Sequence, residues 1–139
     1  MSRMQRTKGA SGEREAAALI HDLTGWDVRR RVRQHGNDSD LTGAPGWAIE
    51  VKRHRTAQAG EIARWWGQTV AQAGNLLPLL LYRADRCEWR ARWPLAVLLT
   101  HQSADYWQGV EWTCDSSIQA WAAVARECAT PGATPMTKR

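Results

Sequence analysis

The chain has 139 residues, 43% of them hydrophobic and 24% charged, which is ordinary for one modest globular domain and leaves no room for a second. No apolar stretch approaches the roughly 18 residues that span a bilayer, the polar N-terminus lacks a secretory signal, and three scattered cysteines argue against a disulfide framework, so we expect a cytoplasmic protein. The net charge is +5, with eleven basic and seven acidic residues through Arg55, and it favours nucleic acid or another polyanion as the partner.

The first half of the chain predicts one helix followed by three strands. Apolar residues at helical spacing and then at alternating positions mark these elements, which Gly25 and a tight turn at Gly43–Gly46 separate. A polar, basic and flexible arm is expected before them, at residues 1–8. The predicted elements are a helix at Ala10–Thr24 and strands at Trp26–Arg33, around Leu41 and at Trp47–Lys52.

The second half predicts a further helix and strand, with additions toward the C-terminus. These are a helix at Glu61–Leu77, strands at Pro78–Arg83 and Glu88–Trp93, a short helix at Pro94–Thr100, a strand within residues 106–114 and a helix from Ser116 or Ser117 to Cys128. This order implies an α/β fold, in which helices flank both faces of a mixed sheet. We expect a single domain over residues 1–130 and a flexible tail at 131–139.

Two carboxylates and a lysine are the residues of this pattern that carry chemistry. Positions i and i+2 of a strand share a face, so Glu50 and Lys52 point the same way, and a short hairpin can bring Asp40 close to Glu50. Two carboxylates form a hard-oxygen site that suits Mg²⁺ or Mn²⁺. An ammonium group beside them can orient a water molecule or stabilise the charge that develops on a phosphate.

The first predicted helix supplies a third carboxylate. Glu13 lies on the same stripe as Ala17 and Ile20 and therefore faces the sheet, whereas Glu15 points roughly the opposite way, into water. A carboxylate on a core-facing stripe is costly unless it is paired or binds a cation. Glu13 is therefore a candidate for the site and Glu15 is not, although the helix dipole alone also favours an acid near a helix N-terminus.

These residues occur in motifs that resemble those of a known nuclease superfamily. The motifs are Lys8-Gly-Ala-Ser-Gly-Glu13-Arg14, Ser39-Asp40-Leu41 and Ile49-Glu50-Val51-Lys52. They resemble the PD-(D/E)XK nucleases, within which the chain is most similar to Holliday-junction resolvases of the archaeal type and to small phage nucleases like them. In two respects the chain departs from the pattern: Ser39 replaces the proline before Asp40, and the spacing from Asp40 to Glu50 is shorter than in many archaeal members.

The resemblance covers about residues 6–93 and implies a restriction-endonuclease-like αβββαβ core with C-terminal α/β additions. It also implies a metal-dependent DNA endonuclease in which Asp40 and Glu50 bind Mg²⁺, with Mn²⁺ able to substitute. Lys52 would assist the attacking water, and Glu13 would complete the site directly or through water. The products would carry a 5′-phosphate and a 3′-hydroxyl.

Basic residues around these motifs form a candidate DNA-binding surface. Four arginines lie on or just after the first predicted strand, where phosphate contact and a solvated strand edge both fit the sequence. The candidate DNA-binding residues are Lys8, Arg14, Arg29, Arg30, Arg31, Arg33, Ser39, Arg53 and Arg55. Related nucleases often place a glutamine on the second helix near the metal, so Gln68 is a candidate for site support, although an ordinary surface amide fits it equally well.

Three functions are compatible with the sequence. The first is a Holliday-junction resolvase, expected as a homodimer because two symmetric strands must be cut, and acting in a bacterial or phage-infected cell. The second is a phage-type nuclease that cuts linear, nicked or end-containing duplex DNA. The third is a basic nucleic-acid-binding module without chemistry, which would have no need of all four residues Glu13, Asp40, Glu50 and Lys52. We adopt the resolvase as the working hypothesis.

Overall fold

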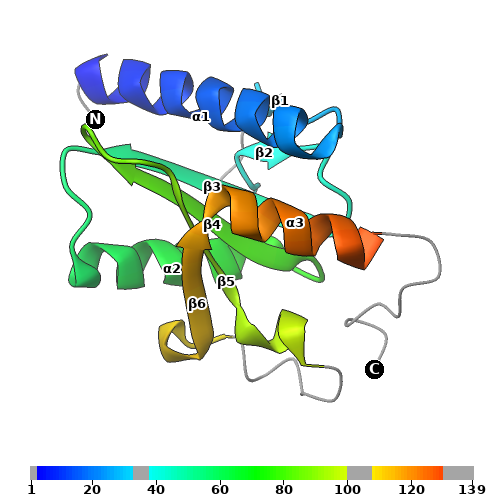
Figure 1. The fold of residues 1–139 in the computed structure, drawn as a ribbon. Coiled ribbons are helices and arrows are strands. Elements are labelled where there is room, and N and C mark those ends of the chain that lie inside the picture. The colour runs from blue at the N-terminus through cyan, green and yellow to red at the C-terminus, as the bar shows by residue number, and fades with distance from the viewer. Residues whose placement is uncertain (1–2, 33–37, 100–107, 130–139) are drawn as a thin grey trace.

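The computed structural model describes residues 3–32, 38–99 and 108–129, which form a six-stranded sheet with three α-helices (Figure 1). In chain order the elements are α1 (Arg3–Thr24), β1 (Arg29–Arg30), β2 (Leu41–Thr42), β3 (Trp47–His54), α2 (Ala59–Ala73), β4 (Leu77–Ala84), β5 (Arg90–Pro94), the 3₁₀ turns η1 (Leu95–Leu98) and η3 (Val110–Trp112), β6 (Thr113–Ser117) and α3 (Ile118–Ala129). The predicted αβββαβ order is therefore confirmed by the elements from α1 to β4, and β5, β6 and α3 are the C-terminal additions.

The sheet is mixed, as predicted. Its strands lie in the order β1-β2-β3-β4-β5-β6; β3 and β4 run parallel and are joined by α2, whereas the other neighbouring strands of the described chain are antiparallel. In the parallel pair, Lys52 lies opposite Tyr82. β2 pairs with β3 only where Leu41 lies opposite Ile49, so on this side β3 continues well beyond its partner.

The helices cover both faces of the sheet, with α1 and α3 on one face and α2 on the other (Figure 1). The larger core lies under α1 and α3 and includes Ile20, Ile49 and Trp121, all of them almost fully buried. A smaller core lies under α2, where Trp66 packs with Leu80. The chain has nine tryptophans and no phenylalanine, so indole rings supply most of the aromatic packing in both cores.

A glycine fixes the hairpin that connects β2 to β3. Gly43 has a φ of +103°, a backbone conformation that residues other than glycine rarely adopt. A Cβ at this position would also lie 2.2 Å from the carbonyl oxygen of Asp27, because the segment before β1 packs directly against the turn. The predicted tight turn is therefore confirmed, and it sets the position of β2 beside β3.

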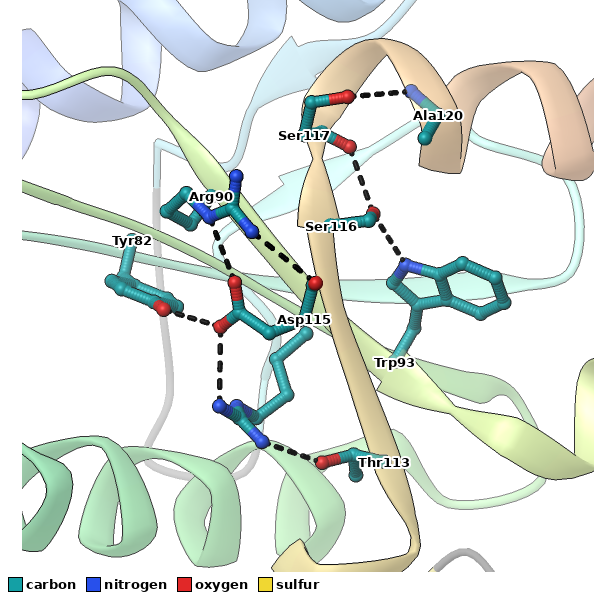
Figure 2. A network of polar contacts seen from close by, with 9 residues as sticks. Tyr82, Arg90, Trp93, Thr113, Asp115, Ser116, Ser117 and Ala120 are labelled. Carbon is teal, nitrogen blue, oxygen red and sulfur yellow. Dashed lines mark hydrogen bonds and ion pairs between the residues drawn. The ribbon is translucent and has the colours of Figure 1, made fainter.

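β6 pairs with β5 along its length, and the carboxylate of Asp115 adds side-chain contacts to both β4 and β5, as Figure 2 shows. Asp115 accepts hydrogen bonds from Arg90 at 2.8 Å, from Arg92 at 3.1 Å and from the hydroxyl of Tyr82. Burial and the Asp115 carboxylate raise the pKa of Tyr82 to about 12, so this hydroxyl remains a donor at neutral pH. The hydroxyl of Ser117 then accepts a 3.1 Å bond from the first turn of α3, which confirms the predicted serine cap.

Two predictions about the N-terminal elements are wrong. Residues 3–8 of the expected arm are helical, because α1 already begins at Arg3, and residues 1–2 lie outside the described ranges. The strand expected over Trp26–Arg33 is reduced to Arg29–Arg30, because its neighbour β2 offers only two residues for pairing.

Later boundaries differ by smaller amounts. The second helix ends at Ala73 rather than at Leu77, because Gly74, with a φ of +58°, turns the chain into β4. The strand expected within residues 106–114 begins only at Thr113, after η3. The tail expected at 131–139 lies outside the described residues. None of the helices in the described ranges is long and apolar enough to cross a membrane.

Candidate active site

β2 and β3 bring two of the predicted carboxylates together. Asp40 directly precedes β2; its backbone N–H donates to the carbonyl of Ile49 at 2.9 Å, and its carboxylate accepts the N–H of Val51 at 2.8 Å. Glu50 lies between these two residues on β3, and its carboxyl group is close enough to that of Asp40 for the two to interact. Both side chains are buried, and Glu50 is only 4% exposed. We refer to Asp40 and Glu50 as the acid pair.

The acid pair cannot easily carry two negative charges. Burial and the charge of Asp40 raise the pKa of Glu50 to about 8, although the neighbouring Lys52 lowers it. The Oε2 atom of Glu50 is buried and has no hydrogen-bond partner among the described residues. Two interacting carboxylates, one with an unpartnered oxygen, fit a hard divalent cation, because the cation would remove their mutual repulsion and bind that oxygen.

Lys52 faces the acid pair from the same side of β3. Its Nζ atom lies 3.6 Å from Oε1 of Glu50, as the alternation of the strand predicts. The lysine side chain is 19% exposed, so the ammonium group lies between the buried acids and the surface. In this position it could hold a water molecule or a phosphate oxygen next to the acid pair.

Glu13 approaches Asp40 from α1, on the other face of the sheet. Burial and the charge of Asp40 raise the pKa of Glu13, whereas Arg30 lowers it. The Nε atom of Arg30 donates to Oε2 of Glu13 at 3.1 Å. Within the described residues, no three Asp, Glu, His or Cys side chains form a group arranged to hold a metal ion. The compact part of the site is therefore the acid pair, with Glu13 beside it and paired to Arg30.

The prediction that Glu15 points into water is wrong. Its carboxylate accepts hydrogen bonds from Arg83 and from the indole N–H of Trp89, the latter at 2.7 Å, and Nη1 of Arg53 lies 3.9 Å away. The helical pattern of α1 defines which residues face the core, but it cannot reveal that the β4–β5 hairpin lies along the flank of the helix. Glu15 therefore has a structural role, in which it ties α1 to β3, β4 and the hairpin.

Besides Arg53, three of the predicted DNA-binding residues form ion pairs within the chain. Lys8 donates to Asp85 at 2.8 Å, Arg29 donates to Asp27 at 3.1 Å, and Arg30 pairs with Glu13 as described above. Both partners in the pair formed by Arg29 are largely exposed, so solvent screens this contact strongly. These contacts leave further N–H donors on each cation for a phosphate.

The remaining basic residues differ in their exposure. Arg14 and Arg55 are exposed. Arg31 is half-buried, and its Nε atom donates to the carbonyl of Ser39 at 2.9 Å, next to Asp40 in the chain. Ser39 itself is buried, and its hydroxyl donates to the carbonyl of Leu41 at 3.3 Å. Arg31 and Ser39 thus hold the segment that carries Asp40, and their contact with DNA stays a prediction.

Three further predicted residues lie away from these contacts or outside the described ranges. Arg53 is half-buried on β3, on the face that α1 covers. Gln68 is exposed on α2, and its support of the site stays a prediction. Arg33 lies outside the described residues.

His54 is a neighbour of the site that the predicted strand boundary left out. It follows Lys52 by two positions on the same face of β3, and its ring stacks on that of Trp65, with centroids 4.8 Å apart and an interplanar angle of 29°. Burial and the charge of Lys52 lower the pKa of His54, which favours the neutral ring. The sequence already places His54 beside the site as a candidate DNA contact, and the longer β3 puts it on the same face as Lys52.

The chain matches a family of nucleases. The model of the family described as “Phage putative PDDEXK endonuclease” matches residues 4–120. The chain belongs to this family and is therefore an endonuclease of the PD-(D/E)XK type. Comparison with curated proteins gives no match.

Among solved structures, the chain is similar to Hjc from Archaeoglobus fulgidus, described as a Holliday junction resolvase from an archaeal hyperthermophile. The two share 20% sequence identity, and the TM-score is 0.47. The similar region covers 85% of this chain and 95% of Hjc.

Proposed function

We propose that this endonuclease hydrolyses phosphodiester bonds of DNA with a divalent cation held by Asp40 and Glu50. The observation that carries the proposal is the acid pair, in which two buried carboxyl groups interact and Oε2 of Glu50 has no partner in the described chain. We propose Mg²⁺ as the natural cation, because it prefers oxygen ligands and binds through one or two carboxylates while it retains waters. Mn²⁺ accepts the same ligands and is expected to substitute.

Each residue of the site has a proposed role. The cation, when bound, would supply Lewis-acid stabilisation of the phosphate. Lys52, 3.6 Å from Glu50, would hold the attacking water beside the acid pair and stabilise negative charge on the phosphate. Glu13 would support Asp40 from α1, directly or through water. Attack on phosphorus would break the bond to the 3′-oxygen and leave a 5′-phosphate and a 3′-hydroxyl.

For the substrate, we propose branched DNA with a four-way junction as the first candidate, cut by a homodimer in the cytoplasm. The support is the resemblance of the motifs around Glu13, Asp40 and Glu50 to those of junction resolvases of the archaeal type. A resolvase must cut two strands symmetrically, and a two-fold dimer places two sites accordingly. The second candidate is linear, nicked or end-containing duplex DNA, since the same site chemistry serves any phosphodiester.

The test is cleavage of an end-labelled synthetic four-way junction in Mg²⁺, with the matching linear duplex in parallel. The variants are Glu50→Gln, which keeps the shape of the side chain but cannot become an anion, and Lys52→Met, which keeps its length. We expect paired symmetric nicks in the junction, loss of at least a hundredfold in rate for both variants, and unchanged DNA binding in EDTA. Glu127→Gln, an exposed position on α3, is the matched control and should cut normally.

Other outcomes separate the alternatives. Equal cutting of junction and duplex would reject the resolvase and keep the nuclease. Undiminished cutting by Glu50→Gln would reject the acid pair as the site. Tight binding without cutting in Mg²⁺ or Mn²⁺ would leave only a DNA-binding module.

A further inference from the structure

A basic groove lies between the first turns of α1 and the C-terminal end of β3. Its volume is about 510 Å³. The lining residues are Arg3, Met4, Thr7, Lys8, Ser11 and Arg53. Three of the six carry positive charge and two carry hydroxyl groups, and such side chains are common ligands of DNA phosphates. We refer to these six residues as the basic groove.

Arg53 forms the floor of the basic groove and is only weakly paired within the chain. α1 lies directly on it: a Cβ at Gly12 would lie 3.1 Å from Cβ of Arg53. The carboxylate of Glu15 is 3.9 Å from Nη1 of Arg53, a long ion pair, and it also binds Arg83 and Trp89. The Nε atom of Arg53 is buried and has no partner within the described ranges. The ion pair of this guanidinium group is thus long, and the residue lines the groove in which a ligand would lie.

Lys8 already binds an anion, which is the chain's own Asp85. The ammonium group donates to both carboxylate oxygens, at 2.8 and 3.0 Å, and this contact lowers the pKa of Asp85. Lys8 is 26% exposed and Asp85 is 41% exposed, so the pair lies at the surface, and a stronger ligand could replace either partner. A phosphate oxygen is such a ligand, since a DNA strand presents many charges together.

The basic groove lies next to the acid pair along one strand. β2 stops pairing with β3 at Ile49, and beyond it the carboxylate of Asp40 accepts the N–H of Val51. Among the described residues, no strand covers β3 on this side from Lys52 to His54. Arg53 is two residues beyond Val51, a step of about 6.7 Å. Arg53 lies on the face of β3 that α1 covers, opposite to Glu50 and Lys52, so a DNA strand that leaves the acid pair reaches the basic groove by passing around this uncovered edge of β3.

We propose that the basic groove binds the backbone phosphates of the DNA strand adjacent to the scissile phosphate, and that Asp85 holds Lys8 until a phosphate displaces it. The inference rests on the proposed function and specifies where its substrate lies. It assigns a role to Asp85, an acid whose removal should strengthen DNA binding. It also assigns Arg3, Thr7 and Ser11, which the sequence did not single out, to the substrate-binding surface.

The test is equilibrium binding of a fluorescent four-way junction and of its linear duplex to the full chain, in EDTA over a range of KCl concentrations. Lys8→Gln should weaken binding several-fold and reduce the slope of log Kd against log salt by roughly 0.7–0.9, the value for one phosphate contact. Asp85→Asn should strengthen binding by about two- to fivefold, because it frees Lys8. Thr7→Glu, which replaces a hydroxyl of the basic groove with a negative charge at an exposed helical position, should weaken binding.

A double variant distinguishes this displacement from a general charge effect. In the Lys8→Gln background, Asp85→Asn should no longer strengthen binding, because the cation that it frees is gone. Glu127→Gln changes the net charge equally, at an exposed position on α3, and gives the size of the general effect. If Asp85→Asn strengthens binding no more than Glu127→Gln does, or equally in both backgrounds, the displacement is rejected.

The inference and the proposed function can fail separately. Junction cutting that depends on Glu50, together with unchanged binding and salt slope in Lys8→Gln and Thr7→Glu, would reject the groove and keep the endonuclease. If the variants change DNA binding as expected but the native chain cuts no DNA with any metal, the groove is kept and the proposed reaction is rejected. Thermal unfolding of each variant provides the check on folding.

Discussion

The surroundings of Glu50 favour its protonated form. The hydrophobic core on one side of β3 and the sheet around it remove water, and Asp40 adds a second acid. The pKa of Glu50 is therefore raised to about 8 from an ordinary 4.5. Such a shift couples the stability of the fold to pH, because the unfolded chain releases this proton more easily than the folded chain does.

The coupling predicts the direction of the pH dependence. Below pH 4.5 both states hold the proton, and the stabilisation is fully present. Between pH 4.5 and about 8 only the folded state holds it, so the free energy of unfolding falls as the pH rises through this range. We expect the Tm in EDTA to decrease from pH 5 to pH 8.5, at about 3–5 °C for each kcal/mol lost.

Glu50→Gln should reduce this decrease, because glutamine has no proton to release, whereas Glu127→Gln should retain it. Melting curves at a series of pH values, recorded by circular dichroism, measure both. A Tm that rises over the same interval in the native chain, or an identical slope in Glu50→Gln, would contradict the assignment.

At the scale of one element, α1 connects the site to the rest of the molecule through two opposite flanks. Glu13 on one flank pairs with Arg30 near Asp40, and Glu15 on the other binds Arg83 and Trp89. The two acids are two residues apart in the chain, so they have nearly the same position along the helix. We therefore expect Glu13 to serve the active site and Glu15 to serve the stability of the fold.

The two flanks predict opposite phenotypes. Glu13→Ala should reduce DNA cleavage by at least about tenfold and change the free energy of unfolding by less than about 1 kcal/mol. Glu15→Ala should leave Arg83 and Trp89 without their acceptor and lower the free energy of unfolding by about 1–3 kcal/mol, with cleavage retained at low temperature. Urea denaturation and the junction assay measure the two effects, and the same phenotype in both variants would disprove the separation.

The β2–β3 turn and α2 give a second element-scale prediction, based on two glycines. Gly43→Ala should destabilise the fold by at least about 2 kcal/mol, because its φ is +103° and the new methyl group would meet the carbonyl of Asp27. Gly67→Ala, at an exposed helical position with no atom near the new Cβ, should stabilise by about 0.5–1 kcal/mol. The urea midpoint should fall below that of the native chain for Gly43→Ala and rise above it for Gly67→Ala.

The sequence predicted the elements and the acid pair because both depend on local spacing. Glu50 and Lys52 share a face through the alternation of one strand, and Asp40 is brought to them by a hairpin of a few residues. Contacts between residues far apart in the sequence could not be predicted. Lys8 forms its ion pair with an acid 77 residues away, from a part of α1 that the polar composition suggested to be an arm.

For residues of α1, the sequence could predict only whether a side chain lies on the apolar stripe that faces the core. Glu13 was correctly expected to face the sheet, because its partners lie under the apolar stripe of the helix. Glu15 was expected in water because the stripe does not include it, but the β4–β5 hairpin supplies Trp89 on that flank. A residue at the margin of a helical stripe can therefore be assigned as buried or exposed only when the positions of the neighbouring elements are known.

At the scale of the whole molecule, one sheet connects all the described elements. The larger core extends from α1 across β3 and β4 to α3, and Asp115 ties β6 to β4 and β5. A fold with one continuous sheet and shared cores is expected to unfold in a single cooperative transition. The single domain over residues 1–130 and the tail at 131–139 stay predictions.

Removal of residues 131–139 tests both the single domain and the flexible tail. The shortened chain should unfold in one transition, with a Tm within about 2 °C of that of the full chain, since the removed segment is rich in proline and threonine and has no apolar run. Coincident curves from tryptophan fluorescence and far-ultraviolet circular dichroism would support a single unit. A second transition, or a large loss of Tm, would contradict it.

The hydrogen bond from Val51 to Asp40 has a spectroscopic consequence. A backbone N–H that donates to a carboxylate at 2.8 Å changes its magnetic environment whenever that carboxylate gains a proton or a cation. In a ¹⁵N-labelled sample, the Val51 amide resonance should therefore shift on titration with acid and on addition of Mg²⁺. One backbone signal would then report the state of the acid pair without a substrate, a label at the site or a substitution in the chain.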